Sequence, residues 1–409
     1  MPVVFDAVAK SSLMPAQKLL FAVDAELQDD YDVIGDASDV VLNGKYQPSD
    51  WSAVADDLAE RLSSIATKRR KSLDDDEDDD GDEYSRDYQR DQISNWLVNA
   101  LERAGRSEEV LAVLEKESRK TGSYERLVKH LIEHKHFDDA KRWATEGITK
   151  TASNFPGIAA NLSKQLCELA AAQMQWDVVA AHAAYEFFDR PSREGFKHLV
   201  QAAAKAHCEE SVNRAAQQFL ETGVAPIQAD SAKKGEIHVR ASKDWPLPMP
   251  EYLVPMLQSE RRIRRVPEPY YGVLIDMAIA DKHPEDVLQW YDKMCAQRKP
   301  SPYGDGWDGP GAHADSVAEA VAKSHPQRSL EIYRQRVEQN LKPTGASAYE
   351  RVAAYLRKMK PVMKAIDREN DWKQLVEDIQ IRYRNRPKLT EILDRLEGKP
   401  ILAMRKTRR

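Results

Sequence analysis

The segment His130-Leu131-Ile132-Glu133-His134 matches the inverted zinc-protease motif residue by residue. Two histidines four positions apart lie on one face of a helix, where both imidazoles can reach one zinc ion, and Glu133 would be the base. Such a site also needs a third ligand on a separate helix and a cleft that excludes water. The motif therefore raises zinc hydrolysis as a remote alternative function.

The same helix already has an apolar packing face. It consists of Leu127, Val128, Leu131 and Ile132. The histidines fall beside this face and next to a polar turn, so we interpret them as scaffold residues and expect neither a catalytic nor a metal site. His130, His134 and His136 remain the candidates for a metal site, since histidine-rich tracts bind metals.

Basic residues cluster in two places, around Arg261–Arg265 and from Arg382 to the C-terminus. Clustered Lys and Arg make electrostatic contacts with phosphates. No recognition-helix motif accompanies these basic residues. We therefore favour an interpretation as a solvated helix face and a frayed tail, or as residues that pair with the acidic run of the same chain. The candidate contacts for nucleic acid or a protein partner are Arg261, Arg262, Arg264, Arg265, Arg384, Arg386 and Lys388.

The acidic run 74–83 follows the basic segment Lys68–Lys71. A calcium loop needs carboxylates at fixed positions around a turn-forming glycine, and this run has no such spacing. Its like charges repel and cannot bury apolar surface. We interpret it as a solvated linker at a domain boundary.

The composition describes a helical protein larger than one compact core. The 409 residues are 42% hydrophobic and 31% charged, with a net charge of -6, which argues against nucleic-acid binding by the chain as a whole. Three widely spaced cysteines fit a reducing compartment. The sequence shows neither a secretory signal nor an apolar run long enough to span a membrane, so we expect a cytoplasmic protein.

Short polar turns separate amphipathic helices along most of the chain. Turns of this kind occur at Ala104–Arg106, His134–His136, Ala280–Leu288, Lys323–Leu330 and Asp367–Trp372. Their irregular spacing lies in the range of tetratricopeptide and HEAT-type repeats. The sequence predicts an all-α protein, an α-solenoid of stacked helical hairpins. A stack divided into two blocks is one arrangement that fits the pattern.

The boundaries follow from composition. We expect an N-terminal helical segment at 1–67, a charged linker at 68–87, a repeat block at 88–222, a proline-rich irregular segment at 223–271, and a second repeat block with a basic tail at 272–409. The irregular segment contains Trp245–Pro250, whose alternate prolines cannot donate backbone hydrogen bonds. The glycine-rich stretch 300–313 lacks the strand and helix that flank a phosphate loop, so we interpret it as a connection.

The chain resembles the long helical region of the bacterial SWIM zinc finger family. The resemblance is carried by Pro48–Ala55, Leu101–Arg106, Arg142–Ile148, Phe219–Gly223 with Trp245–Pro248, Val287–Asp292 and Ala354–Lys358. These are packing and turn motifs. The Cys-x-Cys and Cys-x-His element that names the family is missing, so zinc and DNA binding do not follow from the resemblance.

The resemblance implies an interaction protein that works beside MoxR-type AAA+ ATPases or von Willebrand factor A proteins. We therefore expect a noncatalytic helical-repeat scaffold that mediates protein–protein interaction without a cofactor, within an AAA+ or nucleic-acid-associated assembly. A nucleic-acid-binding accessory protein that uses the basic segments is the alternative.

Overall fold

The computed structural model describes residues 2–29, 31, 33–65, 80–231, 237–257, 267–297 and 309–396. This part of the chain is built from α-helices that pack in chain order, together with one two-stranded β-hairpin. Contacts divide the protein into two compact units. Unit 1 is Met1–His182 with Gln228–Arg240 and Leu247–Arg264, and unit 2 is Ala183–Ile227 with Ala241–Pro246 and Arg265–Arg409.

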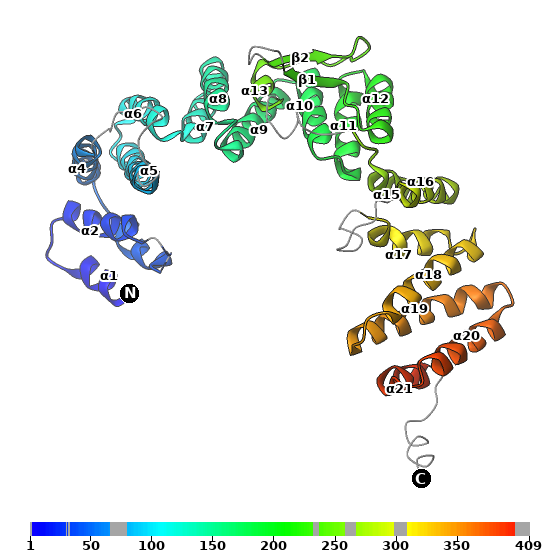
Figure 1. The fold of residues 1–409 in the computed structure, drawn as a ribbon. Helices are drawn as coiled ribbons and strands as arrows, with labels where there is room; N and C mark the ends of the chain where they lie inside the picture. Colours follow the sequence, from blue (N-terminus) through cyan, green and yellow to red (C-terminus); the bar gives the residue numbers. More distant parts are fainter. Residues whose placement is uncertain are drawn as a thin grey trace. The chain divides into compact units, whose positions relative to one another are not determined.

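Unit 1 begins with short helices and continues as a stack of longer ones (Figure 1). Its helices are α1 (Pro2–Lys10), α2 (Pro15–Leu27), η1 (Gly35–Ser38), α3 (Asp39–Leu42), α4 (Pro48–Ser64), α5 (Asp80–Arg103), α6 (Ser107–Thr121), α7 (Tyr124–Glu133), α8 (Phe137–Thr151), α9 (Pro156–Ala172), η2 (Glu251–Leu253) and α13 (Val254–Leu257). From α4 to α9 each helix packs against the next, and α7 also contacts α9. The boundary between the units falls within α10 (Trp176–Asp189).

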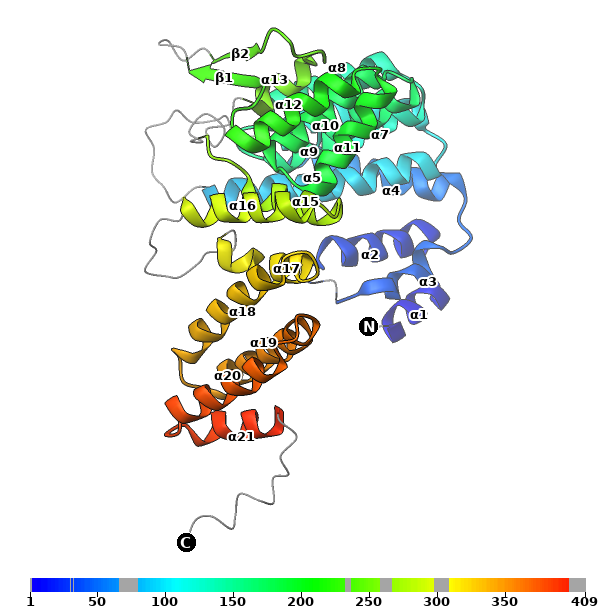
Figure 2. The same cartoon turned by 90° about the vertical axis from the view of Figure 1, so that its right-hand side faces the viewer.

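Unit 2 repeats this arrangement (Figure 2). Its helices are α11 (Arg193–Lys205), α12 (Glu209–Thr222), α15 (Tyr271–Ala280), α16 (Pro284–Ala296), α17 (Pro310–Val321), α18 (Pro326–Leu341), α19 (Ala346–Ala365), α20 (Glu369–Arg382) and α21 (Pro387–Leu396). One apolar core runs from Ile275 in α15 to Leu393 in α21. Each unit is thus an α-solenoid stack, as the sequence predicted.

One kind of turn recurs between paired helices. The second residue after the first helix is left-handed at Gly105, Lys135, Met174, His207, Lys282 and Asp367. At Lys135, for example, the next amide donates to the carbonyl at the end of α7, with His136 N and Leu131 O 2.8 Å apart. This is the Schellman arrangement, which satisfies a carbonyl at the helix end and reverses the chain. Four of the predicted turns, at Ala104–Arg106, His134–His136, Ala280–Leu288 and Asp367–Trp372, therefore share one structural motif, whereas Lys323–Leu330 has no left-handed residue.

Two expected boundaries differ from the structure. Helix α5 begins at Asp80, inside the range 68–87 expected to be a charged linker. The range 223–271, expected to be irregular, contains the strands β1 (Ile227–Ser231) and β2 (Ile237–Ala241) as well as η2 and α13. Tyr252 and Leu253 of η2 are buried, and η2 packs against α8, so apolar residues between the prolines fold onto unit 1.

No helix among the described residues is long and apolar enough to cross a membrane. The helices carry charged residues on their exposed faces. Their apolar side chains are instead buried between neighbouring helices, as in α4, where Trp51, Val54 and Leu58 face inward.

Candidate functional site

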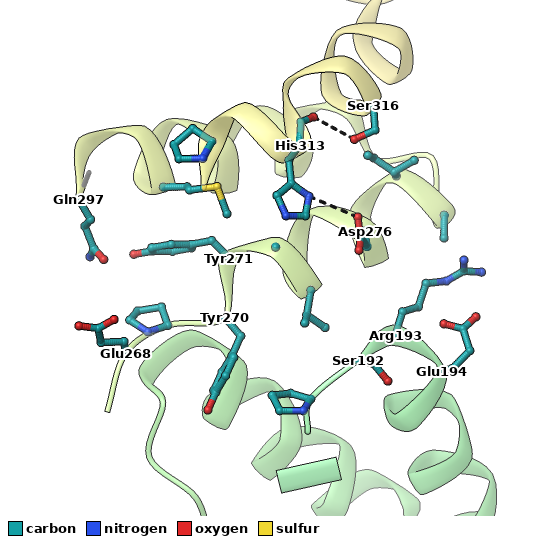
Figure 3. A pocket seen from close by; sticks show the side chains of 18 residues that line it. Ser192, Arg193, Glu194, Glu268, Tyr270, Tyr271, Asp276, Gln297, His313 and Ser316 are labelled. Carbon is teal, nitrogen blue, oxygen red and sulfur yellow. Dashed lines mark hydrogen bonds and ion pairs between the residues drawn. The ribbon is translucent and has the colours of Figure 1, made fainter. Parts of the chain in front are cut away.

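A cavity of about 840 Å³ lies in unit 2 where α11, α15, α16 and α17 meet (Figure 3). We call it the α15 groove. Its apolar and aromatic lining includes Pro191, Pro269, Tyr270, Tyr271, Met294 and Pro310. Its polar lining includes Arg193, Glu194, Glu268, Asp276, His313 and Ser316.

The end of α12 fixes one wall of the groove. The Tyr270 amide donates to the Leu220 carbonyl, with N and O 2.7 Å apart, and the Phe219 and Tyr270 rings lie 4.9 Å apart. Gly223 has a φ of +75°, and a Cβ at this position would lie 2.3 Å from the backbone nitrogen of Glu268. Glycine at the end of α12 therefore lets the segment before α15 pass in close contact with that helix.

His313 is held against the first turn of α15. A Cβ added to Gly272 would lie 2.7 Å from His313 Nε2, so only glycine leaves room for the ring there. The imidazole Nδ1 lies 3.7 Å from Asp276 Oδ1, and Figure 3 shows the two side chains facing each other. His313 is 17% exposed and Asp276 is 53% exposed, so the pair reaches from the packed interior to the rim of the groove.

The α15 groove combines the features of a surface that binds protein segments. Tyrosine and methionine supply apolar contact area, and the tyrosine hydroxyls and charged side chains supply directional contacts. Ligand sites are typically concave and mostly apolar, with a few polar groups that fix orientation. The groove has this composition.

The predicted histidine candidates lie together in unit 1, at the C-terminal end of α7. The His130 and His134 rings are 4.1 Å apart. His136 is exposed and stands at the N-cap of α8. Over the described ranges, no three His, Cys, Asp or Glu side chains are grouped so that they could hold a metal ion.

Burial lowers the pKa of His130 below its ordinary value of 6.5, and the neighbouring His134 lowers it further. The carboxylates of Glu102 and Glu133 act in the opposite direction, and His136 adds a smaller lowering effect. Because the lowering effects dominate, the His130 ring stays neutral to a lower pH than an exposed histidine.

The predicted basic contacts are only partly described. Arg261, Arg262, Arg264, Arg265 and the C-terminal tail lie outside the described residues, as does most of the acidic run 74–83. Arg386 donates to the Leu341 carbonyl at 2.6 Å and lies over the Tyr383 ring at 4.7 Å. Lys388 lies 3.9 Å from Glu391. Arg386 and Lys388 thus have partners within unit 2, while Arg384 is exposed.

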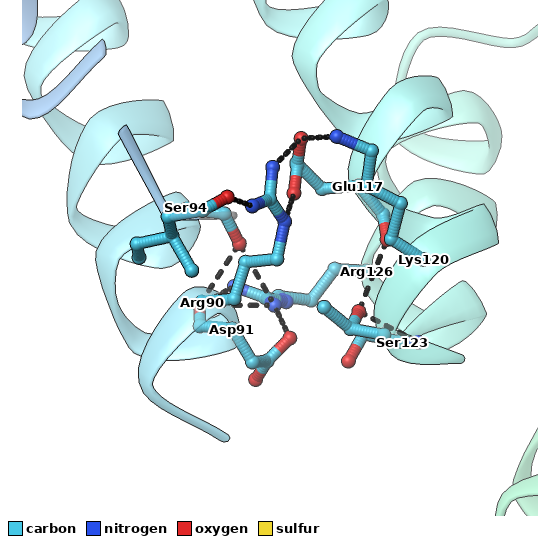
Figure 4. A network of polar contacts seen from close by, with 9 residues as sticks. Arg90, Asp91, Ser94, Glu117, Lys120, Ser123 and Arg126 are labelled. Carbon is cyan, nitrogen blue, oxygen red and sulfur yellow. Dashed lines mark hydrogen bonds and ion pairs between the residues drawn. The ribbon is translucent and has the colours of Figure 1, made fainter. Parts of the chain in front are cut away.

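A buried polar network joins α5 to α6 in unit 1 (Figure 4). Arg90 Nε lies 2.6 Å from Glu117 Oε2, and a second bond joins Nη2 to Oε1 at 3.0 Å. The guanidinium also donates to the Ile65 carbonyl at the end of α4. Both side chains are about 95% buried, so the pair is satisfied internally and fixes how α5 faces α6.

Sequence reasoning did not identify the α15 groove. The residues before α15 were assigned to an irregular segment, and His313 was placed at the end of a connecting loop. The run Pro267-Glu268-Pro269-Tyr270-Tyr271-Gly272 was the available signal, because it sets two tyrosines and a glycine at a helix start. It took the packing of α17 on α15 to bring His313 to Gly272.

These features define the class of protein. Consecutive helical pairs, joined by one recurrent turn and packed on their neighbours, are the organisation of α-helical repeat proteins. No family model matches the chain, and no curated protein shows significant similarity to it. The class is therefore shown by the fold alone.

Proposed function

We propose that the protein is a noncatalytic helical-repeat scaffold that binds a segment of a protein partner in the α15 groove. The observation that carries the proposal is the 840 Å³ cavity of unit 2, which is lined by tyrosine, proline and methionine side chains and by polar side chains from α11, α15 and α17. Helical-repeat proteins use surfaces of this kind to bind partners.

The groove chemistry favours a peptide over a rigid small molecule. Its lining contains aromatic rings together with basic and acidic side chains, which suits an extended chain with apolar side chains and exposed amides. Tyr270 and Tyr271 contribute large, stiff contact surfaces at low entropic cost. A partner segment with one or two large apolar anchors would fit this surface best.

The resemblance to the SWIM zinc finger family suggests which partners to test first. It points to MoxR-type AAA+ ATPases and von Willebrand factor A proteins, in a cytoplasmic assembly. That choice rests on the resemblance, whereas the groove proposal rests on its lining residues.

The proposal predicts that filling the α15 groove abolishes partner binding. Ala280→Arg introduces a long cation at an exposed position that lines the groove. Ala320→Arg is the matched control, because Ala320 is also exposed near the end of a helix of unit 2 but is not among the lining residues. A photo-crosslinking residue at Ser316 would first identify the partner that occupies the groove in cells.

Binding of the purified partner would then be measured by titration calorimetry. We expect Ala280→Arg to weaken binding at least tenfold, because it combines a steric clash with an unmatched charge, and Ala320→Arg to leave the dissociation constant within twofold. Equal loss in both variants, or none in Ala280→Arg, would contradict a binding role for the groove.

A further inference from the structure

The side chains of two histidines lie next to each other at the end of α7, in an arrangement that helix packing alone does not require. His130 and His134 are one helical turn apart, and their rings lie 4.1 Å apart at an interplanar angle of 32°. His134 is exposed and His130 is half-buried. Both imidazoles are thus beside each other at the surface of unit 1.

A backbone contact fixes which nitrogen of His134 is available. Its Nδ1 lies 2.9 Å from the His130 carbonyl oxygen. A carbonyl only accepts hydrogen bonds, so Nδ1 carries the proton and donates. The neutral ring then has its lone pair on Nε2, which is the arrangement found in metal-binding histidines whose other nitrogen donates to a backbone carbonyl.

The surrounding charges also favour a cation. His134 is the C-cap of α7, so the partial negative charge of the helix end acts on the pair. The carboxylates of Glu102 and Glu133 interact electrostatically with the His130 ring, and Glu133 also lies 3.9 Å from Lys129. The site thus offers neutral nitrogen ligands near two carboxylates and the end of a helix.

We propose that His130 and His134 form an open two-histidine site for a divalent transition-metal ion, with water completing the coordination. Neutral imidazole nitrogen suits Cu²⁺, Ni²⁺ and Zn²⁺, and affinity for such a ligand set follows the order Cu²⁺ above Ni²⁺ and Zn²⁺. The described residues supply no third side chain to the pair, so the site is exchangeable and differs from a closed structural zinc site.

The test uses the full-length protein and the metal ion alone. Cu²⁺ and Zn²⁺ are titrated into the metal-free wild type, His130→Gln, His134→Gln and the control His198→Gln, followed by calorimetry. His198 is an exposed histidine on α11 in unit 2 and no metal ligand is proposed there. We expect each of the first two substitutions to weaken the tightest site at least tenfold and the control to leave it unchanged.

A second measurement needs no variant. Electron paramagnetic resonance of the wild type with one equivalent of Cu²⁺ should show hyperfine coupling to two imidazole nitrogens. Coupling to one nitrogen, or an equal dissociation constant for wild type and His134→Gln, would overturn the proposal. A loss of affinity in His198→Gln equal to that in His134→Gln would overturn it as well.

The proposal predicts that metal affinity falls as the pH is lowered. Protons compete with the metal for the same ring nitrogens, so affinity falls as the pH drops through the histidine pKa values. Affinity that rises as the pH is lowered from 7 would contradict histidine ligation.

Discussion

Five residues with side chains adopt a left-handed backbone conformation at the turns between paired helices. They are Lys135, Met174, His207, Lys282 and Asp367, with φ between 56° and 63°. Residues other than glycine pay about 1–2 kcal/mol for this conformation. Gly105 occupies the same position at the turn between α5 and α6 without that cost. The turn is therefore maintained by packing of the helices on either side.

This strain predicts that glycine stabilises such a turn. Met174 has φ of 56° and is 73% exposed, so its side chain contributes little packing. We expect Met174→Gly to raise the free energy of unfolding by about 1 kcal/mol, since the relief of strain exceeds the entropy lost by glycine. Chemical denaturation followed by circular dichroism measures the change.

The preceding residue provides the control for this prediction. Gln173 has φ of -90° in the same turn and gains nothing from glycine. We expect Gln173→Gly to destabilise the protein by up to about 1 kcal/mol. Equal changes in both variants would show that the left-handed backbone is not strained.

At the scale of elements, Gly147 in α8 marks a close approach between helices of unit 1. A Cβ at this position would lie 2.7 Å from Leu162 Cδ1 of α9 and 2.7 Å from Tyr124 Cγ of α7. Both neighbours are fully buried, so neither has space to withdraw. The absence of a side chain at 147 thus sets how closely α7, α8 and α9 pack.

We predict that Gly147→Ala destabilises the protein even though alanine favours helix. The gain in helix propensity is about 1 kcal/mol, whereas overpacking a buried contact costs about 1–3 kcal/mol. The expected net effect is a lower melting temperature, measured by calorimetry.

Gly157→Ala is the matched control. Gly157 lies in the first turn of α9, and a Cβ there would meet no atom within 4 Å. We expect Gly157→Ala to be neutral or to stabilise the protein by up to about 1 kcal/mol. A neutral or stabilising effect of Gly147→Ala would contradict the close packing of α7, α8 and α9.

Proline is the first residue of several helices. The helices α2, α4, α9, α16, α17 and α18 begin with proline at the first position. Proline has the φ of a helix and lacks an amide that would remain unbonded there. At α4, Pro48 is the first helical residue and Asp50 accepts from the Gln47 amide at 2.8 Å.

At the scale of the whole molecule, stability should be local. In a helical-repeat stack each helix contacts its neighbours in the chain, so a disturbance should not spread far. Local opening is measured by amide hydrogen exchange, because buried helices exchange slowly until they unfold.

We therefore predict a confined exchange pattern for Gly147→Ala. Amides of α7, α8 and α9 should exchange faster than in the wild type, while those of α18 and α19 in unit 2 should not change. Mass spectrometry of peptic fragments resolves these segments. Faster exchange of α18 and α19 to the same extent would show that the two units unfold as one cooperative body.

The sequence by itself determined the class of fold and the places where the chain turns. Apolar periodicity within helices and polar turns between them are local properties, and they predicted the all-α stack and the turns at Lys135, Lys282 and Asp367. It also placed His130 and His134 on one helix face, since that follows from their spacing alone.

Only the tertiary structure decided which residues meet across helices. The α15 groove joins Arg193 to His313, residues far apart in the chain, and the packing of α17 on α15 against Gly272 has no signature in local pattern. The pairing of Arg90 with Glu117, and the folding of Tyr252 onto unit 1, likewise depend on how neighbouring helices face each other. The apolar pattern of the sequence identifies the helices, because helix formation depends on residues that are near in the chain. A site between helices depends on the packing of side chains that are far apart in the chain.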